Sequence, residues 1–340
     1  MSLIILSVET SCDETSAAVL VDGTIVKSNI ISSQVDVHRK FGGVVPEVAS
    51  RKHLELINHV IREALDEAGI DFDELDAVAV TYGPGLVGAL LVGVAAAKAI
   101  AFGLDIPLIG VNHLEGHVSA NFLVEPKPNF PVICLVVSGG HTDLVLISGF
   151  GQYDLLGATR DDAAGEAFDK VARVLGLGYP GGPLIDKLAA SGDDTAIPLP
   201  RAYLAGDSLD FSFSGLKTAV INHLHRASQK GFHVNKANVA ASFRRAAVDV
   251  LVDKTLLAAR QHNTGTIMLA GGVAANQLLR EEMTRRAHQE ARRLIYPPPV
   301  LCTDNAAMIG CAAYYKYLRG DFAPLTLNAV PNLPLGQDRY

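Results

Sequence analysis

The chain contains an internal duplication, and this repeat restricts its possible folds more than any other feature. The first copy reads as three apolar strands separated by turns, at Leu3–Val8, Ser16–Val21 and Thr24–Ile31. The same plan recurs with a strand at Val132–Val137, a polar turn and a strand at Asp143–Ile147. Short apolar runs punctuated by polar turns predict hairpins. A repeated hairpin predicts two related lobes.

Amphipathic helices follow the hairpin in both copies. In the first copy the apolar face consists of Leu54, Ile57, Ile61, Leu65 and Ala68, before Gly69. In the second copy it consists of Ala164, Phe168, Val171 and Leu175, before Gly176. Strands followed by helices predict two α/β lobes that face each other across a cleft. This plan resembles the actin-like ATPase superfamily, so the expected fold is two-lobed with duplicated ASKHA-type domains.

A third glycine-containing turn belongs to the same pattern. The buried strand Thr266–Ala270 leads through Gly271-Gly272 to Asn276 and the helix Gln277–Ala287. Glycines at a strand-to-helix turn let a ligand approach the backbone, and the start of a helix favours an anion. Together with the two hairpin turns, this segment predicts a ligand site.

Two histidines four residues apart suggest a metal site. His113 and His117 follow the strand Leu108–Val111, and on a helix their imidazoles share one face. Asp304 follows a short predicted strand and precedes the helix Ala306–Leu318. Two histidines and one carboxylate suit Fe(II) or Zn(II) better than Mg²⁺, and the sequence does not choose between the first two.

A zinc protease is the competing interpretation of the histidine pair. Such proteases place the general-base glutamate directly after the first histidine. Here Glu115 comes two residues after His113, a rotation of about 200° on a helix, which points it away from the metal face. The spacing therefore excludes the protease.

Composition and charge restrict the partners and the compartment. The net charge of −7 means that a nucleic-acid substrate would need a local basic strip or a partner protein. No basic and apolar leader precedes the first strand, and the four cysteines are widely spaced. The apolar stretch Leu86–Leu104 contains Lys98 and reads as a buried core helix. We expect a cytoplasmic protein with no membrane association.

Seven spaced motifs resemble the TsaD, Kae and Qri family, from about Leu3 to Leu327. They are Ser7–Thr15, His113–His117, Val137–Thr142, Asp162–Lys170, Tyr179–Pro183, Phe211–Lys217 and Gly271–Asn276. The resemblance implies a tRNA N6-adenosine threonylcarbamoyltransferase. Such an enzyme uses threonylcarbamoyl-AMP to modify the adenosine next to the anticodon in tRNAs that read codons beginning with adenine. It also implies a TsaB-like paralogue and a TsaE-like ATPase as partners, with the donor made by a TsaC-type synthase.

The resemblance also assigns residues to roles. The metal, Fe(II) by resemblance with Zn(II) as the alternative, would be held by His113, His117 and Asp304. The adenylate would be bound by Val136, Val137, Ser138, Gly139, Gly140, Asp169, Gly182, Asp186 and Asn276. Asp13 and Glu14 would lie at the catalytic end, where Asp13 can accept the proton shed by the attacking amine.

The expected domains follow from the repeat and the resemblance. The N-terminal lobe spans 1–112, the C-terminal lobe with the metal and nucleotide site spans 113–305, a helix at 306–327 packs back on the N-terminal lobe, and a tail spans 328–340. The main alternative function is an ATP-dependent phosphotransferase or ATPase of the same fold, which leaves the histidine pair unexplained. A non-catalytic scaffold is a second alternative, although scaffolds tend to lose ligand-site residues.

Overall fold

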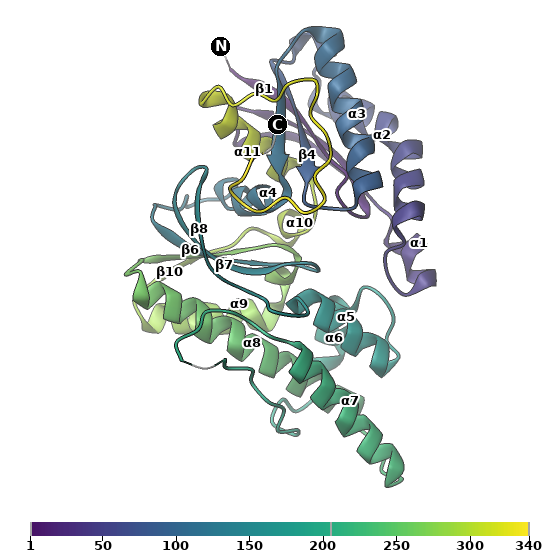
Figure 1. Cartoon of the computed structure of the whole chain (residues 1–340), viewed down its shortest axis with the longest axis vertical. Helices are drawn as coiled ribbons and strands as arrows, with labels where there is room; N and C mark the ends of the chain where they lie inside the picture. The colour runs from purple at the N-terminus through teal and green to yellow at the C-terminus, as the bar shows by residue number, and fades with distance from the viewer. Residues whose placement is uncertain (1, 205, 339–340) are drawn as a thin grey trace. The chain divides into compact units, whose positions relative to one another are not determined.

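The protein divides into two compact units, each built around one five-stranded sheet (Figure 1). The computed structural model describes residues 2–204 and 206–338. Unit 1 comprises Met1–Lys127 and Pro297–Tyr340, and unit 2 comprises Pro128–Tyr296. Long-range packing of the C-terminal segment therefore makes unit 1 discontinuous in sequence.

The sheet of unit 1 has the strand order β3-β2-β1-β4-β5. Its strands are β1 (Ile4–Glu9), β2 (Glu14–Val21), β3 (Ile25–Ser33), β4 (Ala77–Gly83) and β5 (Leu108–Asn112). Strand β1 pairs antiparallel with β2 and parallel with β4, while β3 pairs antiparallel with β2 and β5 pairs parallel with β4. The predicted opening hairpin is confirmed.

Helices cover both faces of this sheet because its strands are apolar on both sides. Leu6 and Val8 belong to the cluster that packs under α2 and α3, whereas Ile5 belongs to the cluster under α11. The helices are α1 (Val35–His38), α2 (Pro46–Ala68), α3 (Val87–Leu104), α4 (His113–Ser119), α10 (Pro299–Cys302) and α11 (Ala306–Leu318). Short 3-10 turns lie at Arg39–Phe41, Phe72–Glu74 and Ala120–Phe122. Figure 1 shows α2 beside α3, and the two helices pack together.

The apolar faces of α2 and α3 are less completely buried than the sequence suggests. Leu54, expected in the core of α2, is 65% exposed, because the buried stripe follows Ile57, Ile61 and Leu65. Helix α3 is long and apolar enough to cross a membrane, but only 33% of it is buried, so the expectation of a buried core helix holds for one face alone. Phe102 on its other face is 74% exposed.

The sheet of unit 2 repeats the topology of unit 1, in the order β10-β9-β6-β7-β8. Its strands are β6 (Val132–Val137), β7 (Thr142–Gly149), β8 (Gln152–Ala158), β9 (Thr266–Ala270) and β10 (Arg293–Ile295). Strand β6 pairs antiparallel with β7 and parallel with β9, as β1 does with β2 and β4. The predicted duplication is confirmed.

The helices of unit 2 follow the expected pattern. They are α5 (Ala164–Leu175), α6 (Gly181–Ala189), α7 (Ser214–Gln229), α8 (Lys236–Gln261) and α9 (Gln277–Gln289), with a 3-10 turn at Gly272–Ala275. Phe168 and Leu175 of α5 are buried as predicted, and Gly176 ends the helix in the left-handed conformation at φ 73°.

The units differ in extent from the lobes expected at 1–112 and 113–305. Helix α4 and the segment 297–305 lie in unit 1, because α4 packs on α11 and α11 packs on β1 and β2. The hydroxyl of Ser7 donates to the carbonyl of Ala306 at 2.7 Å. Beyond residue 327, Val330 N donates to the carbonyl of Tyr82, and Lys316 pairs with Asp338 at 2.7 Å. The segment after residue 327 is therefore part of the packed unit.

Candidate functional site

The predicted metal residues meet within unit 1. Strand β5 ends at Asn112, whose side chain accepts hydrogen bonds from the backbone N–H groups of Leu114 and Glu115 and so starts α4. His113 and His117 occupy consecutive turns of α4, with ring centroids 4.6 Å apart. Asp304 Oδ1 lies 3.5 Å from His113 Nε2 and 3.2 Å from His117 Nε2. The ligand atoms of the three residues all lie within 4.8 Å of one another.

Close packing of two helices brings Asp304 to the histidines. A Cβ on Gly116 would lie 2.6 Å from Ile309 Cδ1, so glycine lets α4 approach α11. Asn305 accepts a hydrogen bond from Met308 N and caps α11 directly after Asp304. The chain reaches Asp304 from α10, a short helix, and not directly from the strand that we expected there, because Pro298 and Pro299 initiate a helical turn.

The electrostatics of this cluster fit a bound cation. His117 is 1% exposed, and among the described residues neither of its ring nitrogens makes a well-aligned hydrogen bond. Burial opposes the charge on Asp304, but the charge of His113 and the contacts with both histidines outweigh it and hold the pKa of Asp304 well below its usual range. The half-buried carboxylate of Asp304 and the buried imidazoles of His113 and His117 form a donor set that suits Fe(II) or Zn(II). The residues present therefore fit the metal that the resemblance implies.

The predicted catalytic carboxylates lie in the same unit as the metal residues. Asp13 is 5% exposed, and its Oδ2 has no hydrogen-bond partner among the described residues. Glu14 accepts a hydrogen bond from the hydroxyl of Ser33. Burial and the nearby charges of Asp304 and Asp13 raise the pKa of Glu14 to about 9. Three crowded carboxylates are a further reason for a cation here, because a positive charge relieves their repulsion.

Glu9 contacts a predicted metal ligand, and the sequence analysis did not single it out. It ends β1 with no exposed surface, and its Oε2 lies 3.0 Å from His113 Nδ1 and 2.6 Å from the donating hydroxyl of Thr81. The hydroxyl of Ser11 also lies 3.1 Å from His113 Nδ1. The signal in the sequence was a carboxylate at the end of an otherwise apolar strand, since such groups are rarely fully buried without a role.

The predicted anion-binding turn lies in unit 2 between β6 and β7. Val136 and Val137 end β6 with buried side chains, so they can offer only backbone groups to a ligand. Ser138 N donates to the carbonyl of His141 and closes the turn. A Cβ on Gly139 or Gly140 would meet no atom within 4 Å, so their backbone is open to a ligand.

Two further glycines hold neighbouring segments against this turn. A Cβ on Gly165 at the start of α5 would lie 2.5 Å from the carbonyl oxygen of Ser138. A Cβ on Gly271, whose φ is 88°, would lie 2.5 Å from the carbonyl oxygen of Val137. The hairpin turn, the start of α5 and the turn after β9 therefore converge.

The remaining predicted adenylate residues also lie in unit 2, in two pairs. Asp169 accepts a hydrogen bond from Gly181 N at 2.7 Å, next to Gly182, where a Cβ would meet open space. Asp186 accepts a hydrogen bond from the Asn276 side chain at 2.7 Å. Arg244, which the sequence analysis did not single out, donates to the same carboxylate at 3.2 Å.

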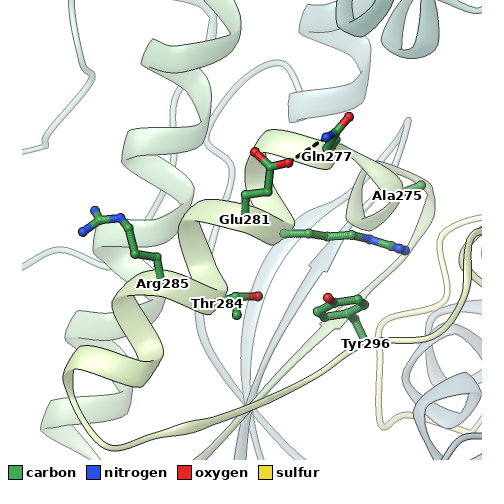
Figure 2. Close-up of a pocket in the computed structure, with 7 residues that line it drawn as sticks. Ala275, Gln277, Glu281, Thr284, Arg285 and Tyr296 are labelled. Atoms are coloured by element: carbon green, nitrogen blue, oxygen red, sulfur yellow. Dashed lines mark hydrogen bonds between the residues drawn. The ribbon is translucent and has the colours of Figure 1, made fainter.

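A pocket of about 600 Å³ lies beside α9 (Figure 2). Its lining consists of Ala275, Gln277, Arg280, Glu281, Thr284, Arg285 and Tyr296. The guanidinium of Arg280 lies 4.7 Å from the centre of the Tyr296 ring, and Gln277 donates to Glu281 at 2.6 Å. None of the predicted site residues lines this pocket.

Sequence comparisons identify relatives of nearly the same length. A family profile described as "TsaD: tRNA N6-adenosine threonylcarbamoyltransferase" matches residues 25–311. The chain is 63% identical over 331 residues to a tRNA N6-adenosine threonylcarbamoyltransferase of Moorella thermoacetica, covering 97% of both chains. It is 58% identical over 334 residues to the protein of that name from Clostridium perfringens strain SM101, covering 98% of both.

Solved structures with little sequence identity share the fold. Component A of the Acidaminococcus fermentans (R)-2-hydroxyglutaryl-CoA dehydratase superposes with a TM-score of 0.56 at 14% identity, over 93% of this chain and 99% of that one. HypF of T. kodakarensis superposes with a TM-score of 0.62 at 15% identity, over 96% of this chain and 49% of that one. The actin-like ATPase fold is thereby confirmed. From the profile and the near full-length relatives, the chain belongs to the TsaD family of tRNA N6-adenosine threonylcarbamoyltransferases.

Proposed function

We propose that this member of the family forms N6-threonylcarbamoyladenosine by drawing the threonylcarbamoyl group from threonylcarbamoyl-AMP. The acceptor is N6 of the adenosine next to the anticodon in tRNAs that read codons beginning with adenine. The observation that carries the proposal is the cluster of His113, His117 and Asp304, in a chain 63% identical to a protein named tRNA N6-adenosine threonylcarbamoyltransferase. The alternative, an ATP-dependent phosphotransferase of the same fold, gives this cluster no role.

The metal proposal rests on the donor set. His113, His117 and Asp304 would hold one divalent cation, which we assign to Fe(II), with Zn(II) as the alternative. When bound, the cation supplies positive charge to donor oxygens on which negative charge develops during transfer. Glu9 holds the ring of His113 through Nδ1 and leaves Nε2 directed toward Asp304.

We assign the donor's adenylate to residues of unit 2. The open backbone of Ser138, Gly139 and Gly140 can donate N–H groups to the phosphate. Asp169 and Asp186 are hydrogen-bond acceptors for ribose hydroxyls, and Asn276 can exchange its contact with Asp186 for one with the ligand. Gly182 leaves space beside Asp169.

We assign the proton transfer to Asp13. As N6 of adenosine bonds to the carbamoyl carbon, the bond from that carbon to the phosphate oxygen breaks and AMP leaves with the electron pair. The attacking nitrogen loses one proton, and the unpartnered Oδ2 of Asp13 is a suitable acceptor for it. Glu14, whose pKa is raised, can hold a proton nearby.

The wider proposal includes partners and a compartment. We propose that the chain works in the cytoplasm with a TsaB-like paralogue and a TsaE-like ATPase, and that a TsaC-type synthase supplies the donor. The exposed apolar residues of α2 and α3 offer a surface for the paralogue.

Depletion of the chain from cells tests the proposed function. Mass spectrometry of tRNA nucleosides should show loss of N6-threonylcarbamoyladenosine, restored by the wild-type chain and not by His117→Ala. Retention of the modified nucleoside after depletion would refute the proposal. Rapid consumption of ATP by the purified chain alone would favour the phosphotransferase instead.

A further inference from the structure

One long segment of unit 2 contains no acidic residue. From residue 211 to residue 248 there are six lysines and arginines and no aspartate or glutamate, although the whole chain carries more acidic than basic residues. The segment consists of the Phe211–Lys217 motif, α7, a turn and the first half of α8. Its charge is opposite in sign to that of the chain.

The N-terminal end of α7 is held by contacts with the rest of unit 2. Asp161 Oδ1 accepts hydrogen bonds from the backbone N–H groups of Phe213 and Ser214, and Asp162 pairs with Lys217 at 2.6 Å. Phe211 and Phe213 are buried with their rings stacked. The motif therefore anchors the start of the helix.

The C-terminal end of α7 and the turn that follows it are exposed and positively charged. We call residues 222–236 the α7 arm; in Figure 1 the end of α7 extends beyond α5 and α6. Arg226 and Lys230 are exposed, and neither has an ion-pair partner among the described residues. The amine of Lys236 donates to the carbonyl of Leu175 at 2.8 Å and pairs with no carboxylate in residues 2–204 and 206–338. Their positive charge is therefore not neutralised by the protein.

An aromatic ring stands beside these charges. Phe232 N donates to the carbonyl of Ala227 at 2.9 Å, and Gly231 turns the chain at φ 69°. At this position after a helix an apolar side chain normally packs back against the helix. The Phe232 side chain is instead 68% exposed. Its backbone is fixed while its ring faces solvent.

We propose that the α7 arm binds the substrate tRNA, with Arg226 and Lys230 on backbone phosphates and Phe232 against an unstacked base. This inference rests on the proposed function, because an acidic chain that modifies RNA needs a local basic surface. Cations without protein partners release counterions when they contact phosphate, and an exposed ring offers a stacking surface. Basic residues at a helix C-terminus also stabilise the helix dipole, but that role does not require the exposed Phe232.

The test compares tRNA binding by full-length variants across salt concentrations. Arg226→Gln with Lys230→Gln should weaken binding of an unmodified tRNA transcript about tenfold and reduce the slope of log K against log salt by about 2. The matched control is Lys27→Gln with Lys40→Gln, which removes the same charge from exposed positions of unit 1. Phe232→Ala should weaken binding about tenfold with the slope unchanged.

Activity assays with threonylcarbamoyl-AMP and the partner proteins separate the two proposals. The double variant Arg226→Gln with Lys230→Gln, here called the arm variant, should have a higher KM for tRNA than the wild type. Its KM for the donor should be unchanged. If the wild-type chain formed no modified nucleoside, the proposed function itself would be refuted. If the slope of log K against log salt in the arm variant equalled that of the wild type, RNA binding by the arm would be refuted. If activity were lost while that slope stayed unchanged, the arm would contact a protein partner instead.

Discussion

Glu9 and His113, separated by more than one hundred positions in the sequence, lie with Oε2 and Nδ1 3.0 Å apart at the edge of the candidate metal site. The carboxylate has no exposed surface and also accepts hydrogen bonds from the hydroxyl of Thr81 and from Ser11 N. A carboxylate bonded to the second nitrogen of a ligating histidine fixes its tautomer and orientation. We therefore propose that Glu9 positions His113 for metal binding.

Glu9→Gln should weaken metal binding while preserving the fold. Loss of such a carboxylate typically lowers metal affinity about 10- to 100-fold. Competition between the protein and a chelator for Zn(II) or Co(II) measures this, and circular dichroism checks the fold. Glu55→Gln on the exposed side of α2 is the control. An unchanged affinity in Glu9→Gln would show that His113 does not depend on this contact.

Substitutions on the exposed face of α3 should block association with the TsaB-like paralogue. Leu91 is 44% exposed and Phe102 is 74% exposed, so glutamate at both positions should cost little stability. Leu91→Glu with Phe102→Glu should abolish the complex in light scattering and leave metal content normal. The matched control, Leu155→Glu with Val174→Glu, replaces two exposed apolar residues of unit 2. A complex that survives the α3 changes would place the interface elsewhere.

The sequence predicts the strands well because each carries its own local pattern. Strands β6 and β9 begin and end at the predicted residues, and the Gly69 and Gly176 helix ends are confirmed. Helix α11 matches the predicted range Ala306–Leu318 and ends before the limit of the helix expected at 306–327. The extent of the units could not be predicted, because it depends on contacts such as Ala306 N with Ser16 Oγ, which join residues 290 positions apart. No local signal reports such packing.

The same limit applies to the candidate site. The spacing of His113 and His117 is visible on a helical projection, and Asp304 was an isolated carboxylate between two predicted elements. Glu9 was hidden because hydrogen-bond partners from β4 and α4 explain its burial only in three dimensions. The interaction between the charges of Glu115 and Lys316 was hidden for the same reason.

Asp143→Asn should stabilise the protein at high pH. Burial raises the pKa of Asp143 to about 6 from 3.8, so the folded state binds a proton that the unfolded state has lost between these values. The free-energy cost of burying the ionised Asp143 carboxylate is absent below about pH 4 and complete above about pH 6. Because the side chain is partly exposed, we expect a gain of about 1 kcal/mol, or about 2 to 4 °C in Tm, at pH 8 and none at pH 4. Calorimetry across this pH range measures the difference, and Asp154→Asn, at an exposed position on β8, is the matched control.

Asp13→Asn should suppress transfer far more than Glu115→Gln, and this order separates a transferase from a zinc protease. In a protease of that kind the glutamate near the first histidine is the general base. Here Glu115 is 7% exposed. Burial opposes the charge on Lys316 in α11, but the charge of Glu115 and the ion pairs with Asp321 and Asp338 outweigh it and raise the pKa of Lys316. Loss of Glu115 should lower Tm by a few degrees, since it weakens packing between α4 and α11. Asp13 instead presents a buried Oδ2 with no hydrogen-bond partner among the described residues, and loss of a general base typically slows a reaction about 10²- to 10⁴-fold.

The assay measures tRNA modification by the Asp13→Asn and Glu115→Gln variants with purified donor and partners, alongside metal content, which should be normal in both. Peptide cleavage should be undetectable in every form. A larger loss of transfer in Glu115→Gln, with metal still bound, would reverse the assignment of these two carboxylates and restore the hydrolase interpretation.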